Sequence, residues 1–250
     1  MKGKKTSQTK REAIRERRRK AQKQKRLMLF LIIIGIALLV TALLIVPNLD
    51  IFNPETEVIQ ITPIDRPMVD GSSIGDATAS VILEVFSDFQ CTACREFARS
   101  VEPLLIQNHI STGQVLLIYR QYPFLDDRNP GNESKQAANA SLCAAEQDRF
   151  WDYHDILFAN LTGVNVGSFT DRKLIAFAET LGFDMDLFES CFRENRYRSV
   201  IDQDIALGRE RNVTGTPSVF INGEIVRPGF VPSYQDLQEA INAALATPGQ

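Results

Sequence analysis

Two cysteines separated by two residues carry the clearest chemistry in the sequence. Cys91 and Cys94 lie in the stretch FSDFQCTACREF, so in a helix they would be one turn apart on the same face. At that separation two thiols can form a disulfide with little movement of the backbone. Such a pair can exchange disulfides with other proteins, form part of a metal site, or brace the fold.

The two thiols are expected to differ in reactivity. Cys91 stands where a helix should begin and faces unpaired backbone N–H groups and the positive end of the helix dipole, which stabilise a thiolate and lower its pKa. Cys94 lies one turn deeper and should be shielded. This asymmetry favours disulfide exchange, in which Cys91 attacks or is attacked while Cys94 closes or opens the ring.

The other two uses of the pair fit the sequence less well and stay as alternatives. A zinc site would need two more ligands, yet Cys143 and Cys191 are far apart without paired ligands nearby, and His109 and His154 lack the spacing of metal sites. We therefore predict no metal. An inert disulfide across so short a loop would constrain the unfolded chain very little.

The segments on either side of the cysteines predict a βαβ unit. Apolar runs at 80–86 and 115–122 are short and rich in Val, Ile and Leu, as in strands buried on both faces. Between them apolar residues recur at helical spacing, with a kink expected at Pro103. This order implies two parallel strands. Further on, Asn222 and Gly223 join two more apolar runs, which is typical of a β-hairpin.

A helical block separates these sheet elements. Between about 130 and 212, apolar residues recur at helical rather than strand spacing. The predicted helices are 134–146, 150–160, 170–181, 184–192 and 195–211, and a last helix at 232–245 follows the hairpin. We predict an α/β fold with an inserted helical subdomain.

The N-terminal end of the chain is strongly basic. From Lys2 to Arg26 there are thirteen Lys or Arg and two acids, whereas the rest of the chain is acidic. A basic arm can bind nucleic acid, but this one directly precedes residues 27–46, which carry no charge and are long enough to span a bilayer as a helix. An excess of Lys and Arg on one side of such a span marks the cytoplasmic side. We therefore predict no nucleic-acid partner.

The apolar segment is expected to stay in the mature protein as an anchor. Secretory signals have a shorter apolar region of about 7 to 15 residues and a small-residue cleavage site, which the following VPNLDIF does not offer. We predict a cytoplasmic tail at 1–26, a single transmembrane anchor at 27–46, a proline-containing extended linker at 47–73 and an extracytoplasmic folded domain at 74–250.

With CTAC after a strand, a helical insertion and VTGTPSVFING downstream, the chain resembles the DsbA-like thiol-disulfide oxidoreductases of the thioredoxin superfamily over about 73–250. The resemblance implies a thioredoxin-like fold in which Cys91 is the exposed nucleophile and Cys94 the buried resolving cysteine. Thr216 and Pro217 match the family's loop, whose proline is cis and lies against the active-site disulfide. The backbone of Thr216 would then pair with a bound substrate chain.

The resemblance also bears on residues around the cysteines. Some members carry a buried acid that relays protons to the resolving thiol. Glu84 is the candidate here, with an edge or solvent-facing carboxylate as the alternative. Strongly oxidising members have Pro-His between the cysteines, whereas this chain has Thr92 and Ala93, which leaves the strength of oxidation open. Trp151 and His154 lie in a stretch that looks like the family's insertion, and we expect them to pack in its core.

Cys143 and Cys191 are predicted to form a structural disulfide. As free thiols outside the cytoplasm they would invite mispairing. Closing a loop of this size would stabilise the fold by about 4 kcal/mol. The alternative is two buried, reduced cysteines in separate places.

Together these expectations describe a membrane-anchored, extracytoplasmic thiol oxidase. It would pass its Cys91–Cys94 disulfide to reduced exported proteins. As the resemblance implies, a membrane partner of the quinone-linked DsbB or vitamin K epoxide reductase type would reoxidise it, and no organic cofactor is needed. A reductase or isomerase of the same fold is the second interpretation. A tethered module that holds peptides or metal in a groove at Thr216 and Pro217 is the third.

Overall fold

The structure, a computed structural model, describes residues 3–45 and 57–246. The chain divides into two compact units, Met1–Glu55 and Thr56–Gln250. The first unit contains one continuous helix, α1 (Gly3–Ile45). The second contains a sheet and all the other helices that the structure describes.

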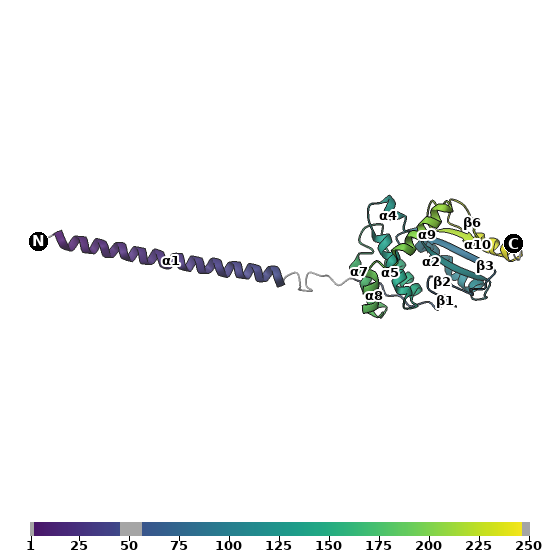
Figure 1. Ribbon diagram of the computed structural model, residues 1–250, viewed down its shortest axis with the longest axis horizontal. Helices are drawn as coiled ribbons and strands as arrows, with labels where there is room; N and C mark the ends of the chain where they lie inside the picture. The colour runs from purple at the N-terminus through teal and green to yellow at the C-terminus, as the bar shows by residue number, and fades with distance from the viewer. Residues whose placement is uncertain (1–2, 46–56, 247–250) are drawn as a thin grey trace. The chain divides into compact units, whose positions relative to one another are not determined.

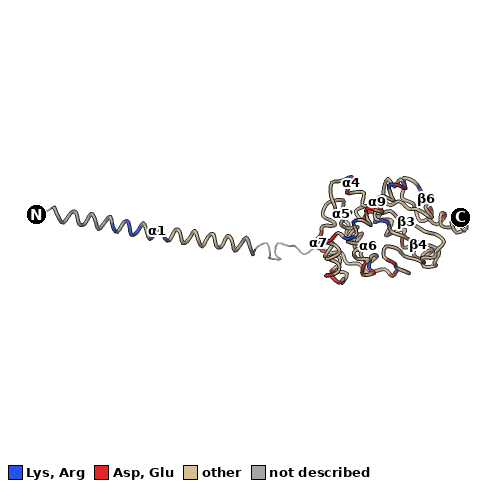
Figure 2. The backbone as a smooth tube through the Cα atoms, in the orientation of Figure 1, with Lys and Arg blue, Asp and Glu red and all other residues tan. Residues whose placement is uncertain are grey.

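By length and composition, α1 includes a section that could cross a membrane. This section is Arg18–Thr41, 24 residues with a mean hydropathy of 1.9. Figure 2 shows the described Lys and Arg of α1 directly before a stretch without charge. The anchor predicted at 27–46 coincides with α1 as far as Ile45, and Val46 lies outside the described residues.

A mixed six-stranded sheet runs through the described part of the second unit in the order β1-β2-β4-β3-β5-β6. Its strands are β1 (Val69–Asp70), β2 (Ser73–Ile74), β3 (Val81–Ser87), β4 (Val115–Gln121), β5 (Ser218–Ile221) and β6 (Glu224–Val226). β3 and β4 are parallel, whereas β5 is antiparallel to both β3 and β6. The predicted parallel pair and the C-terminal hairpin are therefore confirmed.

Helices connect the strands and cover the sheet. They are α2 (Thr92–Ser100), α3 (Glu102–Leu105), the π-helical turn η3 (Ile106–Ile110), α4 (Leu125–Arg128), α5 (Glu133–Ala145), α6 (Phe150–Ala159), α7 (Asp171–Thr180), α8 (Met185–Arg193), α9 (Arg198–Glu210) and α10 (Tyr234–Ala246). α2 ends at Ser100, three residues before Pro103, the position of the predicted kink. The predicted helical block is confirmed as α5 to α9, and Figure 1 shows α5, α7 and α8 gathered away from β6 and α10.

The linker predicted at 47–73 is wrong over its C-terminal part. The Ile59 N–H donates to the Asn160 side chain at 2.8 Å, and Asn160 Nδ2 donates back to the Ile59 carbonyl at 3.0 Å. Arg66 is buried in ion pairs with Glu102 and Asp155. Strands β1 and β2 then extend the sheet next to β4. The folded domain therefore begins well before residue 74, and residues 47–56 of the predicted linker lie outside the described residues.

The sheet packs apolar side chains on both faces. On one face Leu83 and Val85 of β3 belong to a large core that includes Cys94 and the helical block. On the other face Phe86 packs with Tyr122, Val213 and Phe220. Because neighbouring residues of a strand point to opposite faces, both sides of β3 are buried from Leu83 onward, whereas Ile82 is exposed.

Trp151 and His154 are both buried in the larger core, as the sequence suggested for the insertion. The His154 ring contacts Phe89 of the cysteine loop, Tyr119 of β4 and Phe158 of α6. Its two ring nitrogens also face carboxylates, Glu102 and Asp155. His154 therefore has a polar environment that packing alone did not lead us to expect.

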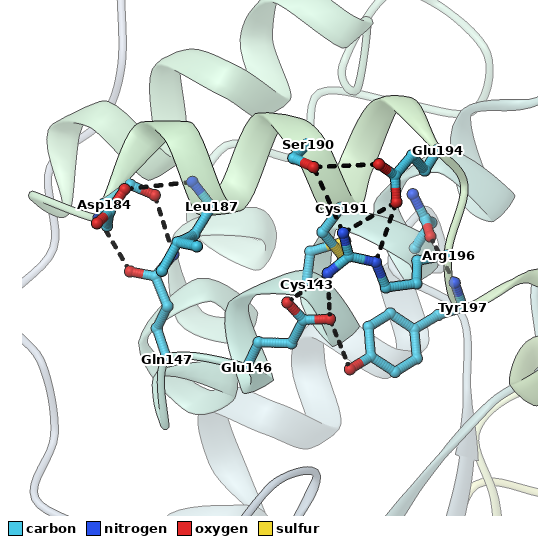
Figure 3. Close-up of polar contacts among 11 residues, drawn as sticks. Cys143, Glu146, Gln147, Asp184, Leu187, Ser190, Cys191, Glu194, Arg196 and Tyr197 are labelled. Atoms are coloured by element: carbon cyan, nitrogen blue, oxygen red, sulfur yellow. Dashed lines mark hydrogen bonds and ion pairs between the residues drawn. A yellow bond between two sulfur atoms is a disulfide. The ribbon is translucent and has the colours of Figure 1, made fainter.

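A disulfide joins Cys143 of α5 to Cys191 of α8, the pair that the sequence suggested. Both sulfurs are buried. Figure 3 shows this bond beneath a polar cluster in which Arg196 donates to both carboxylate oxygens of Glu146, at 3.0 and 2.9 Å, and Tyr197 donates to Glu146 at 3.1 Å. The disulfide thus joins α5 to α8, and the polar contacts join the residue that follows α5 to the segment that follows α8.

Candidate active site

Cys91 and Cys94 lie at the start of α2 and differ sharply in exposure. Cys91 occupies the N-cap position, and its backbone N–H donates to the Asp88 carbonyl at 2.9 Å. Cys91 is partly exposed, whereas Cys94 is 1% exposed; both thiols are free. Cys91 is therefore the exposed sulfur and Cys94 the shielded one, as we predicted from the sequence.

The two thiols also have opposite pKa shifts. The pKa of Cys91 is lowered to about 6. The hydrogen bond with the Cys94 thiol is the largest cause, the backbone N–H groups of Ala93 and Cys94 contribute in the same direction, and burial opposes them. Burial raises the pKa of Cys94 well above its ordinary value. At neutral pH Cys91 is mostly a thiolate and Cys94 a thiol, which is the division of roles that exchange requires.

The loop before β5 reaches the exposed sulfur. The Thr216–Pro217 peptide bond is cis, and the Thr216 carbonyl oxygen lies 3.3 Å from Cys91 Sγ, where it accepts a hydrogen bond from the protonated thiol. Two contacts hold this loop, because Tyr122 Oη donates to the Val213 carbonyl and Arg128 donates to the Thr214 carbonyl, both at 3.1 Å. Thr216 and Pro217 thus lie beside Cys91, where the resemblance implied.

Asp88 is a buried acid at this site that the sequence did not single out. Its carboxylate accepts hydrogen bonds from the Gln90 N–H at 2.8 Å, the Leu125 N–H at 3.0 Å and Ser134 Oγ at 2.7 Å. Burial raises its pKa to about 7. Asp88 therefore ties the loop that carries Cys91 to α4 and α5. In the sequence, an acid directly after an apolar strand was the one sign that Asp88 is buried. Its partners Leu125 and Ser134 could not be foreseen, because they lie 37 and 46 residues away.

Glu84 does not take the predicted role of proton relay. It projects from the face of β3 opposite Val85 and Cys94, and forms ion pairs with Arg120 at 2.8 Å and with Arg211. Burial alone would raise the pKa of Glu84, but its hydrogen bonds with Arg211 and Arg120 hold the pKa below the usual value. Glu84 is thus an ionised structural carboxylate, and both the relay and the solvent-facing alternative are wrong.

No group of three or more His, Cys, Asp or Glu side chains among the described residues is arranged to hold a metal ion. The Cys91–Cys94 pair also lacks such neighbours. The site therefore consists of a reactive thiol at Cys91, a shielded thiol at Cys94 and a backbone acceptor, the Thr216 carbonyl, beside Cys91.

The family model described as Thioredoxin matches residues 68–243, so the chain belongs to the thioredoxin family. Within it the chain is a DsbA-like thiol-disulfide oxidoreductase. Probable disulfide bond formation protein D of Bacillus anthracis is 26% identical over 175 residues, which cover 69% of this chain and 77% of that protein. The crystal structure of oxidised BdbD from Bacillus subtilis, 21% identical, has a TM-score of 0.63 and covers 76% of this chain and 100% of that one.

A stretch of another kind of protein is also similar. The Na(+)/H(+) antiporter NhaA 3 of Salinispora tropica is 32% identical over 149 residues. These residues cover 60% of this chain but 21% of the antiporter, so the similarity concerns one part of that protein.

Proposed function

We propose that the chain is a membrane-anchored, extracytoplasmic thiol oxidase that donates the Cys91–Cys94 disulfide to reduced exported proteins. The observation that carries this proposal is the partly exposed Cys91 at the N-cap of α2, beside the Thr216 carbonyl and one turn before the buried Cys94. The opposite pKa shifts of the two thiols, to about 6 for Cys91 and well above the ordinary value for Cys94, agree with it. A stabilised Cys91 thiolate favours the reduced form of the pair, which makes its disulfide a stronger oxidant.

In the proposed reaction, a substrate thiolate attacks Cys91 Sγ of the oxidised pair. A bond forms between the substrate sulfur and Cys91 Sγ, and the Cys91–Cys94 bond breaks. Cys94 keeps the electron pair of the broken bond and takes up a proton. A second substrate thiolate then attacks the substrate sulfur of this mixed disulfide. The substrate leaves oxidised, and Cys91 leaves as a thiolate, for which its lowered pKa makes it a good leaving group.

The substrate chain is proposed to lie along the Thr216–Pro217 loop. Support comes from the contact between Cys91 Sγ and the Thr216 carbonyl, which puts a backbone acceptor next to the sulfur that is attacked. A backbone N–H of the substrate can use that acceptor whatever its side chain is, so binding of this kind suits varied substrates.

The proposed location and partner rest on α1 and on the family. The basic residues before the apolar section of α1 favour an N-terminus in the cytoplasm and a catalytic domain outside it. An anchor would keep the domain near emerging chains and near a membrane partner of the quinone-linked DsbB or vitamin K epoxide reductase type, which would restore the disulfide. The name of the Bacillus anthracis relative, a probable disulfide bond formation protein, agrees with oxidation as the direction.

The test is a redox titration of the full chain in detergent together with oxidative refolding of a reduced, unfolded disulfide protein. We expect a potential above the value of about −270 mV typical of thioredoxin, and refolding that depends on Cys91. A more negative potential with no oxidation of substrate would support the reductase or isomerase interpretation. Undiminished function of a Cys91→Ser variant would support a peptide- or metal-holding module.

A further inference from the structure

An open apolar pocket lies along the helix that carries the two cysteines. Its volume is about 570 Å³, which is within the range of pockets that bind ligands in proteins. Ala98 of α2 and Phe158 of α6 line two of its sides, and Ile59 and Ile64 of the N-terminal segment line a third. The described residues that line it include neither the cysteines nor the 216–217 loop, so the pocket is separate from the active site.

The N-terminal wall of the pocket is held in place, although its apolar side chains are exposed. The Ile59 N–H donates to Asn160 Oδ1 at 2.8 Å, and Asn160 Nδ2 donates to the Ile59 carbonyl at 3.0 Å. The side chains of this wall nevertheless remain in solvent, since Ile59 is 58% and Ile64 52% exposed. Large apolar side chains that a fold holds in exposed positions beside a pocket favour binding of an apolar group there.

The pocket lies within reach of a chain bonded to Cys91. Cys91, Arg95 and Ala98 follow one another along one face of α2, because they are four and three residues apart. With a rise of 1.5 Å per residue, Ala98 is about 10 Å along the helix from Cys91. Arg95 Nη1 donates to the Leu161 carbonyl at 3.0 Å, which keeps this face beside the end of α6. An extended chain advances about 3.3–3.6 Å per residue, so about three to five residues connect a sulfur at Cys91 to the pocket.

Arg99 gives the pocket a positive charge that is available to a ligand. It lines the pocket, is exposed, and forms no ion pair with the residues that the structure describes. Asp155 also lines the pocket, but its carboxylate is already paired inside the fold. The exposed acids Glu57 and Asp65 belong to the N-terminal segment but do not line the pocket. An apolar group with a carboxylate beside it therefore matches both the lining and the charge.

We propose that this pocket is a second contact for the substrates of Cys91. It takes an apolar side chain that lies about three to five residues from the reacting cysteine of the substrate, and Arg99 faces an acidic residue next to that side chain. The ligand is a segment of reduced, unfolded protein, because a folded protein buries most of its large apolar side chains. The inference rests on the proposed exchange at Cys91 and adds a preference among its substrates.

The test measures how the sequence around a substrate cysteine changes its binding. The full chain with Cys94→Ser is placed in lipid nanodiscs, because detergent would itself enter an apolar pocket, and Cys91 is loaded with glutathione as a mixed disulfide. A peptide thiol then displaces glutathione, so one disulfide forms as another breaks and no oxidant is needed. Mass spectrometry gives the equilibrium constant of this exchange.

Matched peptides of Gly and Ser carry one Cys and a Leu-Glu pair, with Leu four residues before or after the Cys. We expect the better of these two to have an equilibrium constant about tenfold above that of the same peptide with Ser in place of Leu. Leu directly next to Cys should bring no such gain, because it is too close to reach the pocket. Replacing Glu by Gln should cost about twofold to threefold, and added salt should remove this difference.

Substitutions in the chain assign these preferences to the pocket. Ile64→Glu should abolish the preference for Leu, and Arg99→Gln should abolish only the preference for Glu. Leu187→Glu is the matched control, because Leu187 is 56% exposed on α8 and does not line the pocket. It should leave both preferences unchanged. A preference for Leu that survives in Ile64→Glu would overturn the proposal, because the apolar contact would then lie elsewhere.

The peptide comparison needs no substitution in the pocket, so it decides even if a pocket variant does not fold. Equal constants for the Leu and Ser peptides would overturn the proposal and leave the pocket to a lipid or another small amphiphile. Failure of Cys91 to form mixed disulfides with glutathione or any peptide would count against the proposed function itself. Loss of the preferences alone concerns the pocket.

Discussion

Cys91 Sγ lies 3.3 Å from the carbonyl oxygen of Thr216, although the two residues are 125 positions apart in the chain. The contact exists because β3 and β5 are neighbours in the sheet: the loop that follows β3 carries the cysteines, and the loop that precedes antiparallel β5 carries Thr216. The nucleophile and the backbone acceptor of the active site therefore lie at the same end of these two adjacent strands.

Replacing the two cysteines one at a time should separate their roles. Cys91→Ser is expected to reduce exchange by about 10³-fold or more, because serine cannot act as the leaving or attacking group. Cys94→Ser should still react once and then accumulate mixed disulfides with substrate, visible on non-reducing gels. Mixed disulfides in Cys91→Ser instead would reverse the assignment.

Alkylation of the reduced chain should follow the ionisation of Cys91. The thiolate is the reactive form, and the pKa of Cys91 is about 6, so the rate should be nearly constant above pH 7 and fall steadily as the pH drops through 6. Mass spectrometry of a short iodoacetamide pulse measures this. If the alkylation rate instead fell to half near the ordinary pKa of cysteine, the main support for the oxidase interpretation would be lost.

Glu84→Gln should lower stability without changing exchange. It leaves Arg120 and Arg211 without their shared carboxylate, which should cost about 1–3 kcal/mol in the free energy of unfolding. Denaturant unfolding measures this loss, and the rate at which the Cys91–Cys94 pair exchanges disulfides should not change. Slower exchange in Glu84→Gln would restore Glu84 to the relay role that its position in the structure argues against.

Asp88 should make stability depend on pH in the direction opposite to most carboxylates. Its pKa rises from 3.8 to about 7 on folding, so between these values the folded chain binds more protons than the unfolded one. Stability contributed by this group is complete below about pH 4 and falls as the pH rises toward 7, with a slope of up to about 1.4 kcal/mol per pH unit. Denaturant unfolding at several pH values should show this slope in the parent and not in Asp88→Asn.

Removing the structural disulfide should weaken the helical insertion and spare the chemistry. The double variant Cys143→Ser, Cys191→Ser is expected to lose about 4 kcal/mol in the free energy of unfolding, since the bond closes a loop of 48 residues. Peptide mapping of the parent under mild reduction provides the control. Labelling of Cys143 and Cys191 as readily as Cys91 would mean that the bond is absent in solution.

The sequence was sufficient wherever a local pattern determines the structure. The apolar runs that became β3 and β4, the turn at Asn222 and Gly223, and the helices of the insertion all follow from periodicity and turn chemistry. The asymmetry of Cys91 and Cys94 follows from their place at the start of a helix.

The sequence was insufficient wherever the partner is distant. β3 is buried on both faces, so its apolar run does not reveal that Glu84 and Cys94 lie on opposite sides of the sheet. Arg66 falls within the predicted linker, and nothing local indicates its partners, because Glu102 and Asp155 lie 36 and 89 residues away. Only the fold brings these charges together.

The Cys143–Cys191 bond makes each molecule a client of the chemistry proposed for it. A newly made chain has both of these sulfurs reduced, and closing the bond passes two electrons and two protons to one disulfide of an older molecule or to another oxidant nearby. The supply of mature protein is thereby linked to the redox balance of its own surroundings.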